Sequence, residues 1–250
     1  MIPQAPIDIS IIVPVYNEAG NAGPLALEIA AAFAGLAAEI IFVDDASTDS
    51  TRHELTALKT KLPSLRVLSH SKNSGQSRAV RTGILAAQGG LIVTLDGDGQ
   101  NNPADAPRLV ARLQAAGPNL AMVGGARIKR QDSFAKKLAS RLGNGVRSAL
   151  LKDGASDTGC GLKAFRREAF LRLPYFDHLH RYLPALMLRE GYEIAFEPVS
   201  HRPRTVGASK YTNLGRLWAS ASDLLGVMWL IGRARLPGPV FEDEALARKD

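Results

Sequence analysis

The chain has 250 residues, 46% of them hydrophobic, which is enough for one large α/β domain with a short appended segment. Its single cysteine excludes an internal disulfide and is typical of a reducing compartment. The net charge of +7 indicates an anionic partner, but with 6% aromatic residues and no recognisable module, nucleic acid is not expected as that partner. No apolar run approaches the roughly 20 residues of a membrane span, and no secretory signal is expected.

Apolar runs typical of strands alternate with helical stretches through the first half of the chain. The expected strands are residues 9–15, 39–43, 66–69, 91–95 and 120–123, and the expected helices are residues 24–36, 50–62, 77–88 and 105–116. Nearly continuous apolar strands separated by helices predict a mostly parallel, Rossmann-like sheet with helices on both faces. In such sheets, ligands bind beyond the carboxyl ends of the strands.

Beyond about residue 126 this alternation stops. Residues 133–152 predict a basic, partly amphipathic helix, residues 161–165 resemble a further strand, and residues 218–231 form an apolar segment. We therefore divide the chain into a main domain (1–215), an apolar interfacial or partner-binding segment (216–237) and a flexible tail (238–250).

Three of the expected strands end in polar or acidic clusters. These clusters are PVYNE (14–18), DDASTD (44–49) and DGDGQ (96–100). In a parallel sheet the three strand ends share one edge, so the clusters are expected to converge on one cleft. Each has a simpler explanation alone, because Asn17 and Glu18 fit a turn, Asp49 or Ser50 fits a helix cap, and the third cluster fits a polar turn. Their occurrence at three matching strand ends favours a shared site.

The cluster at 96–100 has the composition of a metal site. Asp96, Asp98 and Gln100 alternate, so their oxygens come together if the backbone bends at Gly97 and Gly99. Mg²⁺ and Mn²⁺ prefer such oxygen ligands, and substrate phosphates complete the coordination shell. Neither a P-loop nor a G-x-G-x-x-G motif follows a strand, so bound phosphate would be met by metal and basic side chains. We therefore predict Mg²⁺ or Mn²⁺ held by Asp96, Asp98 and Gln100.

Seven motifs, in order along the chain, resemble the family 2 glycosyltransferases with a GT-A fold. They are IIVPVYNE (11–18), VDDASTDST (43–51), KNSGQSRAVRTG (72–83), LDGDGQNNP (95–103), VGGAR (123–127), DTGCGLKAFRR (157–167) and RTVGASKY (204–211). The last two resemble the polyprenyl-phosphate branch, which includes dolichol-phosphate mannosyltransferase and its bacterial undecaprenyl-phosphate relatives. The resemblance covers about residues 7–215.

The resemblance implies a role for each matching residue. The implied nucleotide-sugar site consists of Pro14, Tyr16, Glu18, Val43, Asp45, Asp96 and Gly97, with Asp45 near the base or ribose. The implied catalytic set consists of Asp98, Arg127, Asp157, Arg204 and Lys210. The three basic residues of this set match positions expected at donor or acceptor phosphates.

The implied reaction is a direct displacement with inversion, in which the phosphate oxygen of a polyprenyl phosphate attacks the anomeric carbon of a UDP- or GDP-sugar. The metal stabilises charge on the leaving diphosphate, and the basic residues offset the repulsion between two phosphates. Asp157 matches a position where some relatives place a base. Because a lipid phosphate is already anionic near neutral pH, Asp157 equally fits a positioning role or a cap of the turn before Gly159.

Two other functions compete with this one. A family 2 enzyme that glycosylates a saccharide or another hydroxyl acceptor would need a true base, so Asp157→Asn would abolish its turnover. A non-enzymatic nucleotide- or membrane-binding module is disfavoured, because binding alone needs no open metal site.

Two segments indicate contact with a membrane surface. Basic residues dominate 127–152, and Phe134, Leu138, Leu142, Val146 and Leu150 form an apolar stripe at spacing four. This pattern is typical of an interfacial helix, with packing of the stripe on the core as the alternative. Lys137, Ser140 and Asn144 match polar positions of the interfacial helix in the branch. Residues 218–231, which contain Trp229 and precede Arg233, fit an interface, a core element or a partner contact. We expect peripheral association with the cytoplasmic, inner face of the membrane, with a separate membrane subunit as a further candidate partner.

Overall fold

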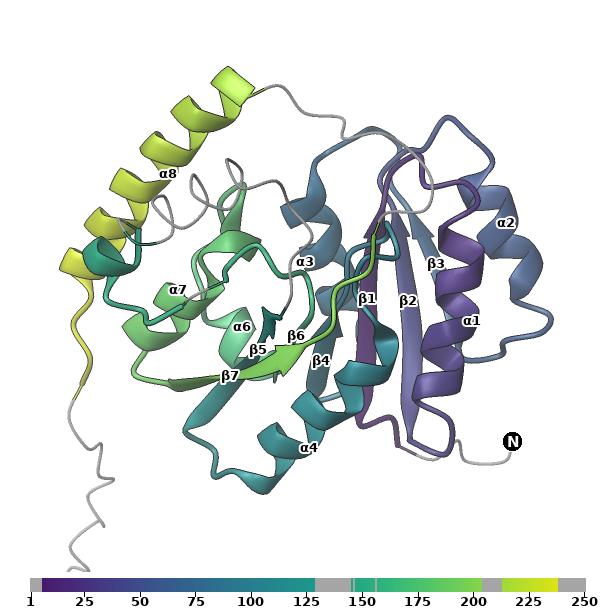
Figure 1. Cartoon of the computed structure of the whole chain (residues 1–250), viewed down its shortest axis with the longest axis horizontal. Coiled ribbons are helices and arrows are strands. Elements are labelled where there is room, and N and C mark those ends of the chain that lie inside the picture. The colour runs from purple at the N-terminus through teal and green to yellow at the C-terminus, as the bar shows by residue number, and fades with distance from the viewer. Residues whose placement is uncertain (1–5, 129–144, 146, 156, 204–212, 238–250) are drawn as a thin grey trace, which may run out of the picture.

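The computed structural model describes residues 6–128, 145, 147–155, 157–203 and 213–237 (Figure 1). Within these residues one seven-stranded sheet has the order β3-β2-β1-β4-β6-β5-β7. The strands are β1 (Ile9–Val15), β2 (Ala38–Asp44), β3 (Leu65–Ser69), β4 (Leu91–Thr94), β5 (Leu120–Arg127), β6 (Lys163–Arg166) and β7 (Glu193–Val199). Neighbouring strands are parallel except at β6, which runs antiparallel to both β4 and β5. The prediction of a mostly parallel α/β sheet is confirmed.

Helices cover both faces of the sheet, as the apolar strands predict. They are α1 (Ala22–Ala32), α2 (Thr51–Leu58), α3 (Gln76–Ala86), α4 (Ala106–Ala115), α6 (Arg167–Leu171), α7 (Leu183–Arg189) and α8 (Asn213–Arg233), with short 3₁₀ turns η1 (Pro103–Asp105) and η2 (Leu179–Arg181). One core cluster joins the sheet to α1, α2 and α4, and the other joins it to α3, α6 and α7 (Figure 1). Within β1, Ile11 and Val13 belong to the first cluster and Ile12 to the second, so the strand carries apolar side chains on both faces.

The boundaries of several elements differ from the sequence-based expectation. Helix α1 ends at Ala32 because the chain turns at Gly35, whose φ of +78° a side chain would disfavour. Strand β7 was not predicted, since its sequence EIAFEPV carries charges and a proline instead of an apolar run. Its place at the border of the sheet explains this composition, because only an edge strand tolerates proline and exposed charge. Of the basic helix expected at 133–152, residues 145 and 147–152 lie among the described residues, and all of these except residue 152 are helical.

Helix α8 contains the apolar segment expected at 218–231 and extends beyond it at both ends. Val227 is buried in the core cluster that includes α7, whereas Leu225 and Trp229 are 67% and 64% exposed. Among the described helices, none combines the length and the hydropathy that a membrane crossing requires. The division of the chain at residues 215 and 237 stays a prediction.

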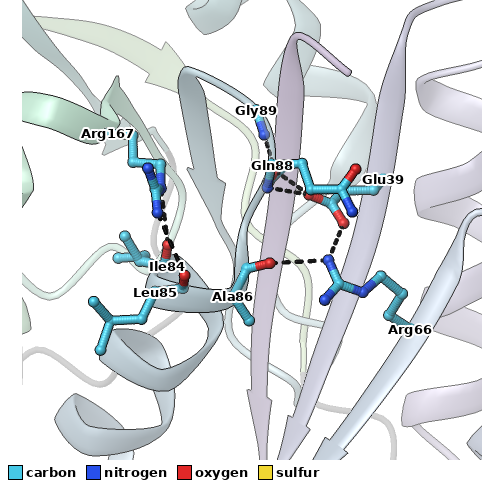
Figure 2. A network of polar contacts seen from close by, with 9 residues as sticks. Glu39, Arg66, Ile84, Leu85, Ala86, Gln88, Gly89 and Arg167 are labelled. Carbon is cyan, nitrogen blue, oxygen red and sulfur yellow. Dashed lines mark hydrogen bonds and ion pairs between the residues drawn. The ribbon is translucent and has the colours of Figure 1, made fainter. Parts of the chain in front are cut away.

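The buried carboxylate of Glu39 joins β1, β2 and β3 near the amino-terminal ends of these strands. Glu39 is 2% exposed and accepts hydrogen bonds from Ser10 Oγ (2.7 Å) and from the backbone N–H of Gln88 (2.6 Å). It also pairs with the Arg66 guanidinium, which in turn donates to the Ala86 carbonyl (2.9 Å) (Figure 2). Burial alone would raise the pKa of Glu39, but the donors from Ser10, Gln88 and Arg66 outweigh it and lower that pKa below its ordinary 4.5.

We expect Glu39→Gln to lower the free energy of unfolding by about 1–3 kcal/mol at neutral pH, because charge-assisted hydrogen bonds are lost from a buried site. Since the folded pKa lies below the unfolded value, the stabilisation is complete above about pH 4.5 and is lost as the pH falls through the folded pKa. Urea unfolding of both proteins at several pH values measures the difference. A difference that stays constant down to strongly acidic pH would contradict the assignment.

Candidate active site

The three polar clusters lie at one edge of the sheet, as the sequence predicts. Strands β2, β1 and β4 are adjacent and parallel, so their carboxyl ends at Asp44, Val15 and Thr94 face the same way. At Gly97 a Cβ would lie 2.6 Å from Val15 Cγ1 and 2.9 Å from the Pro14 carbonyl oxygen. Glycine is therefore required there for the loop after β4 to pack against the end of β1.

The loop after β1 is held by side chains from the segment that follows β2. Asn17 has a φ of +52°, and its Oδ1 accepts the Thr48 N–H at 2.7 Å. The Glu18 N–H donates to Thr51 Oγ1 at 2.8 Å, while the Glu18 carboxylate accepts from Asn21 Nδ2 at 2.9 Å. Tyr16 is 38% exposed at this edge. The loop is thus a fixed wall of the expected nucleoside pocket.

Asp49 acts in part as the helix cap that the sequence suggested. Its carboxylate accepts the backbone N–H groups of Thr51 (3.0 Å) and Ala19 (3.1 Å), whereas Ser50, at the N-cap position of α2, makes no side-chain cap hydrogen bond. Asp49 therefore joins the start of α2 to the loop after β1.

Asp45 is buried at the end of β2, where it organises the loop that leads into α3. Its Oδ1 lies 2.7 Å from His70 Nδ1 and accepts the Ser74 N–H at 2.9 Å, and its Oδ2 accepts the Gly75 N–H at 2.8 Å. His70 Nε2 lies 2.9 Å from Thr82 Oγ1, which fixes the ring. The neighbouring Val43 side chain is fully buried in the core beneath α3.

Asp96 lies in a close-fitting position after β4. Its Oδ1 accepts a hydrogen bond from Gln76 Nε2 at 2.9 Å, and its backbone N–H donates to Asn101 Oδ1 at 3.1 Å. A Cβ on Gly161 would lie 2.2 Å from Asp96 Oδ2. Burial and repulsion from Asp98 raise the pKa of Asp96 to about 6, against the opposing charges of Lys163 and Arg127.

Asp98 and Gln100 stand beside Asp96 in a half-buried loop. Asp98 Oδ1 accepts the Gln100 N–H at 3.1 Å. The Gln100 carbonyl accepts the Arg202 N–H at 3.0 Å, and Gln100 Nε2 donates to the Arg202 carbonyl at 3.5 Å. Because the amide nitrogen faces Arg202, the amide oxygen is the atom of Gln100 that would serve the expected metal. Two carboxylates and one amide therefore stand close together on this loop.

Arg127 and Asp157, two residues of the expected catalytic set, form an ion pair. Arg127 Nε donates to Asp157 Oδ2 at 2.6 Å, and its guanidinium nitrogen NH2 donates to Oδ1 at 2.7 Å, which is the bidentate geometry. Burial would lower the pKa of Arg127, but the hydrogen bonds and charge of Asp157 raise it. Arg204 and Lys210 lie outside the described residues, as do Lys137, Ser140 and Asn144.

The segment that follows β7 is joined to the loop that follows β4. Asn101 and His201 form an antiparallel bridge, and Arg202 donates to Asn102 Oδ1 at 2.6 Å. The Ser200 N–H and hydroxyl both donate to Asp105 Oδ2. The segment 200–203, which follows β7, is therefore held beside the loop 96–102, which carries the expected metal ligands.

Lys163 was not predicted as a site residue. It is a buried lysine whose charge acts on Asp96. It is 5% exposed on β6 and its ammonium group donates to the Cys160 carbonyl. Burial lowers the pKa of Lys163, although the nearby charges of Cys160, Asp96 and Asp157 oppose this. Gly161 and Gln76 were also missed. All three lie within the matched motifs, but their contacts with Asp96 join segments far apart in the sequence.

Comparison with known proteins identifies the family. The model of glycosyl transferase family 2 matches residues 10–173. Dodecaprenyl-phosphate galacturonate synthase from Rhizobium johnstonii is 32% identical over 244 residues, covering 96% of this chain and 72% of the relative. Undecaprenyl-phosphate 4-deoxy-4-formamido-L-arabinose transferase from Sodalis glossinidius is 36% identical over 211 residues, covering 82% of this chain and 63% of the relative. The chain is thus shorter than the curated relatives that it matches.

Solved structures share the fold. Glucosyl-3-phosphoglycerate synthase from Mycobacterium tuberculosis, in complex with UDP, superposes with a TM-score of 0.66 at 22% identity, covering 92% of this chain and 81% of that one. A mannosyltransferase from Pyrobaculum calidifontis, in complex with GDP-Man and Mn²⁺, gives a TM-score of 0.65 at 20% identity, covering 92% and 65%. The fold is therefore GT-A-like, and the chain is a glycosyltransferase that belongs to glycosyl transferase family 2.

Proposed function

We propose that the protein transfers a sugar from a UDP- or GDP-sugar to the phosphate of a polyprenyl phosphate, with inversion and with Mg²⁺ or Mn²⁺. The observation that carries the proposal is that Asp45, which follows β2, and the pair Asp96 and Asp98, which follows β4, lie at the same end of the sheet on either side of β1. A nucleoside next to Asp45 would direct its diphosphate toward the pair. The mannosyltransferase and synthase structures described above hold GDP-Man and UDP, which supports a nucleotide-sugar donor.

The chemistry of the donor atoms fits Mg²⁺ or Mn²⁺. The site offers hard oxygen ligands from Asp96, Asp98 and Gln100, and in the described part of the chain no group of three or more His, Cys, Asp or Glu side chains is arranged for a metal ion. A site with only two carboxylates suits a cation whose remaining ligands are substrate phosphates and water. When bound, the cation supplies charge stabilisation to the leaving diphosphate.

The names of the relatives support a lipid phosphate acceptor, since dodecaprenyl phosphate and undecaprenyl phosphate appear in them. The ion pair of Arg127 and Asp157 supports the same acceptor. Both oxygens of Asp157 already accept hydrogen bonds from the guanidinium, which suits a positioning role better than proton removal. A phosphate acceptor needs no strong base, because it is anionic near neutral pH. The alternative, a family 2 enzyme with a hydroxyl acceptor, requires Asp157 to take a proton.

A membrane surface is part of the proposal, because polyprenyl phosphates reside in membranes. The exposed Leu225 and Trp229 of α8, followed by Arg233, suit the interface between lipid tails and anionic headgroups. We place the protein on the inner face of the cytoplasmic membrane, with a separate membrane subunit as a further candidate partner.

Asp157→Asn separates the two acceptor classes. For a phosphate acceptor we expect kcat to fall by no more than about tenfold, since the amide oxygen still accepts one hydrogen bond from Arg127, although the charge and the second hydrogen bond are lost. For a hydroxyl acceptor, loss of a general base would lower kcat by roughly 100- to 10,000-fold. Steady-state kinetics with a lipid phosphate decides between them, and a loss of the larger size would contradict the positioning role.

The proposal is tested with a panel of UDP- and GDP-sugars, Mg²⁺ or Mn²⁺, and undecaprenyl phosphate, scored for glycolipid product. We expect product with one donor class and none after chelation of the metal. Turnover of a donor without any lipid product would contradict the acceptor assignment.

A further inference from the structure

The first turn of α3 touches both halves of the proposed donor site. Residues 74–77 follow β3 and cross the ends of β2 and β4. At one side the Ser74 and Gly75 N–H groups donate to Asp45, at 2.9 and 2.8 Å. At the other side Gln76 Nε2 donates to Asp96 Oδ1 at 2.9 Å. Three consecutive residues thus connect the nucleoside-binding carboxylate to a metal-binding carboxylate.

Asp45 has acceptor capacity for one further donor. A carboxylate offers about four lone-pair positions, two on each oxygen. His70 and Ser74 occupy Oδ1, whereas Oδ2 accepts only from Gly75 among the described contacts. A nucleoside N–H or ribose hydroxyl that bonds to Oδ2 would share that oxygen with Gly75. Nucleoside binding therefore acts directly on the residue that precedes Gln76.

The other end of α3 is fastened to the core, which confines any adjustment to the first turn. Arg66 donates to the Ala86 carbonyl at 2.9 Å, and Arg167 donates to the carbonyls of Ile84 (3.0 Å) and Leu85 (3.3 Å) (Figure 2). These carbonyls belong to the last turn of α3, where backbone acceptors lack helical partners. Because these hydrogen bonds hold the last turn of the helix in place, a displacement of Gly75 also moves Gln76.

A further contact fixes the direction of the first turn. Ser77 Oγ lies 2.7 Å from His180 Nδ1, in the segment of η2. Gly75 begins the helix with a φ of +86°, a conformation that other residues rarely adopt. The turn is therefore held from three sides, by Asp45, Asp96 and His180, and the side chain of Gln76 has a defined direction.

We propose that Gln76 is a positioning residue that couples nucleoside binding at Asp45 to cation binding at Asp96, Asp98 and Gln100. By donating to Oδ1, Gln76 orients the Asp96 carboxylate, and nucleoside bonding to Asp45 steadies Gln76 in that position. The two ligands then favour each other without touching, which is coupling through the protein. The inference rests on the proposed donor and metal sites.

The test measures Mn²⁺ affinity by electron paramagnetic resonance of free Mn²⁺, with and without saturating uridine or guanosine. A nucleoside carries no phosphate, so it cannot bridge to the metal as a nucleotide would. In the unaltered protein we expect the nucleoside that binds to raise Mn²⁺ affinity by about fivefold or more. In Gln76→Met, which keeps the length of the side chain but has no N–H donor, this factor should fall to about one, with nucleoside affinity in the absence of metal unchanged.

Gln114→Met is the matched control, because Gln114 is exposed on α4, away from the site, and this variant should keep the full coupling. Binding of nucleoside and Mn²⁺ without mutual effect in the unaltered protein would overturn the inference and leave the proposed function intact. Coupling that persists in Gln76→Met would also overturn the inference. Failure to bind either ligand would overturn the proposed function, and the inference with it.

Discussion

Asp98→Asn is expected to lower kcat/KM by on the order of 100- to 1,000-fold, a loss typical of removing one preorganised electrostatic contact from an active site. The variant keeps the size of the side chain and its hydrogen bond from the Gln100 N–H. It loses the charge that a divalent cation requires. Repulsion between Asp98 and Asp96 also disappears, so the metal-free protein should be at least as stable as the unaltered one. Donor turnover together with thermal unfolding measures both effects.

Glu39→Gln is the control for this experiment. It also neutralises a carboxylate, but that carboxylate is buried near the amino-terminal ends of the strands, at the opposite end of the sheet from Asp98. It should lower stability and leave kcat/KM nearly unchanged. Retention of full turnover by Asp98→Asn at saturating metal would show that Asp98 is not a metal ligand.

Gly161→Ala is expected to lower kcat/KM by about 100-fold, the size of effect that a misplacement of about 1 Å produces at a reacting centre. The added Cβ would lie 2.2 Å from Asp96 Oδ2 and 2.3 Å from its Cγ. The Asp96 carboxylate can rotate away, which relieves the contact but breaks the hydrogen bond from Gln76. We therefore expect a large loss of activity and of Mn²⁺ affinity with only a small loss of stability.

Gly90→Ala is the matched control, since a Cβ there meets nothing within 4 Å and its φ is not in the left-handed region. That variant should keep its activity. Equal activity of the two alanine variants would contradict the placement of Asp96 against Gly161.

The sequence predicted correctly those strands whose apolar composition reflects burial on both faces of the sheet. Strands β1 and β4 are mostly apolar because they are buried on both faces, and the polar residues that follow them lie at the edge where such sheets bind ligands. Strand β7 was not recognisable, because an edge strand carries charges and a proline. The antiparallel direction of β6 was not predictable either, since its short sequence KAFR contains no information about direction.

The candidate site was predictable as a set of residues but not as a set of contacts. Asp96, Asp98 and Gln100 are close in the sequence, so their proximity follows from the loop. Arg127 and Asp157 were both assigned from matched motifs, but their pairing depends on how β5 meets the segment before β6. Gln76 and Gly161 act on Asp96 from 20 and 65 positions away, and no pattern within either segment indicates this.

The first turn of α3 contacts both carboxylates of the candidate donor site. It lies between Asp45 and Asp96, and the arginines at the far end of the helix keep it in place. A donor site built this way would be partly formed before the substrate arrives, which lowers the cost of ordering it during binding. The predicted coupling of nucleoside and Mn²⁺ measures the ordering that nucleoside binding still has to supply.

The central claim is transfer to a lipid phosphate, and a comparison of two acceptors tests it most directly. The full chain is incubated with a radiolabelled nucleotide-sugar, Mn²⁺, and vesicles containing either undecaprenyl phosphate or undecaprenol, and the lipids are then extracted. We predict labelled glycolipid from undecaprenyl phosphate and none from undecaprenol, because the attacking atom is the phosphate oxygen. Labelling of undecaprenol, or turnover of the donor without labelling of undecaprenyl phosphate, would contradict transfer to a lipid phosphate.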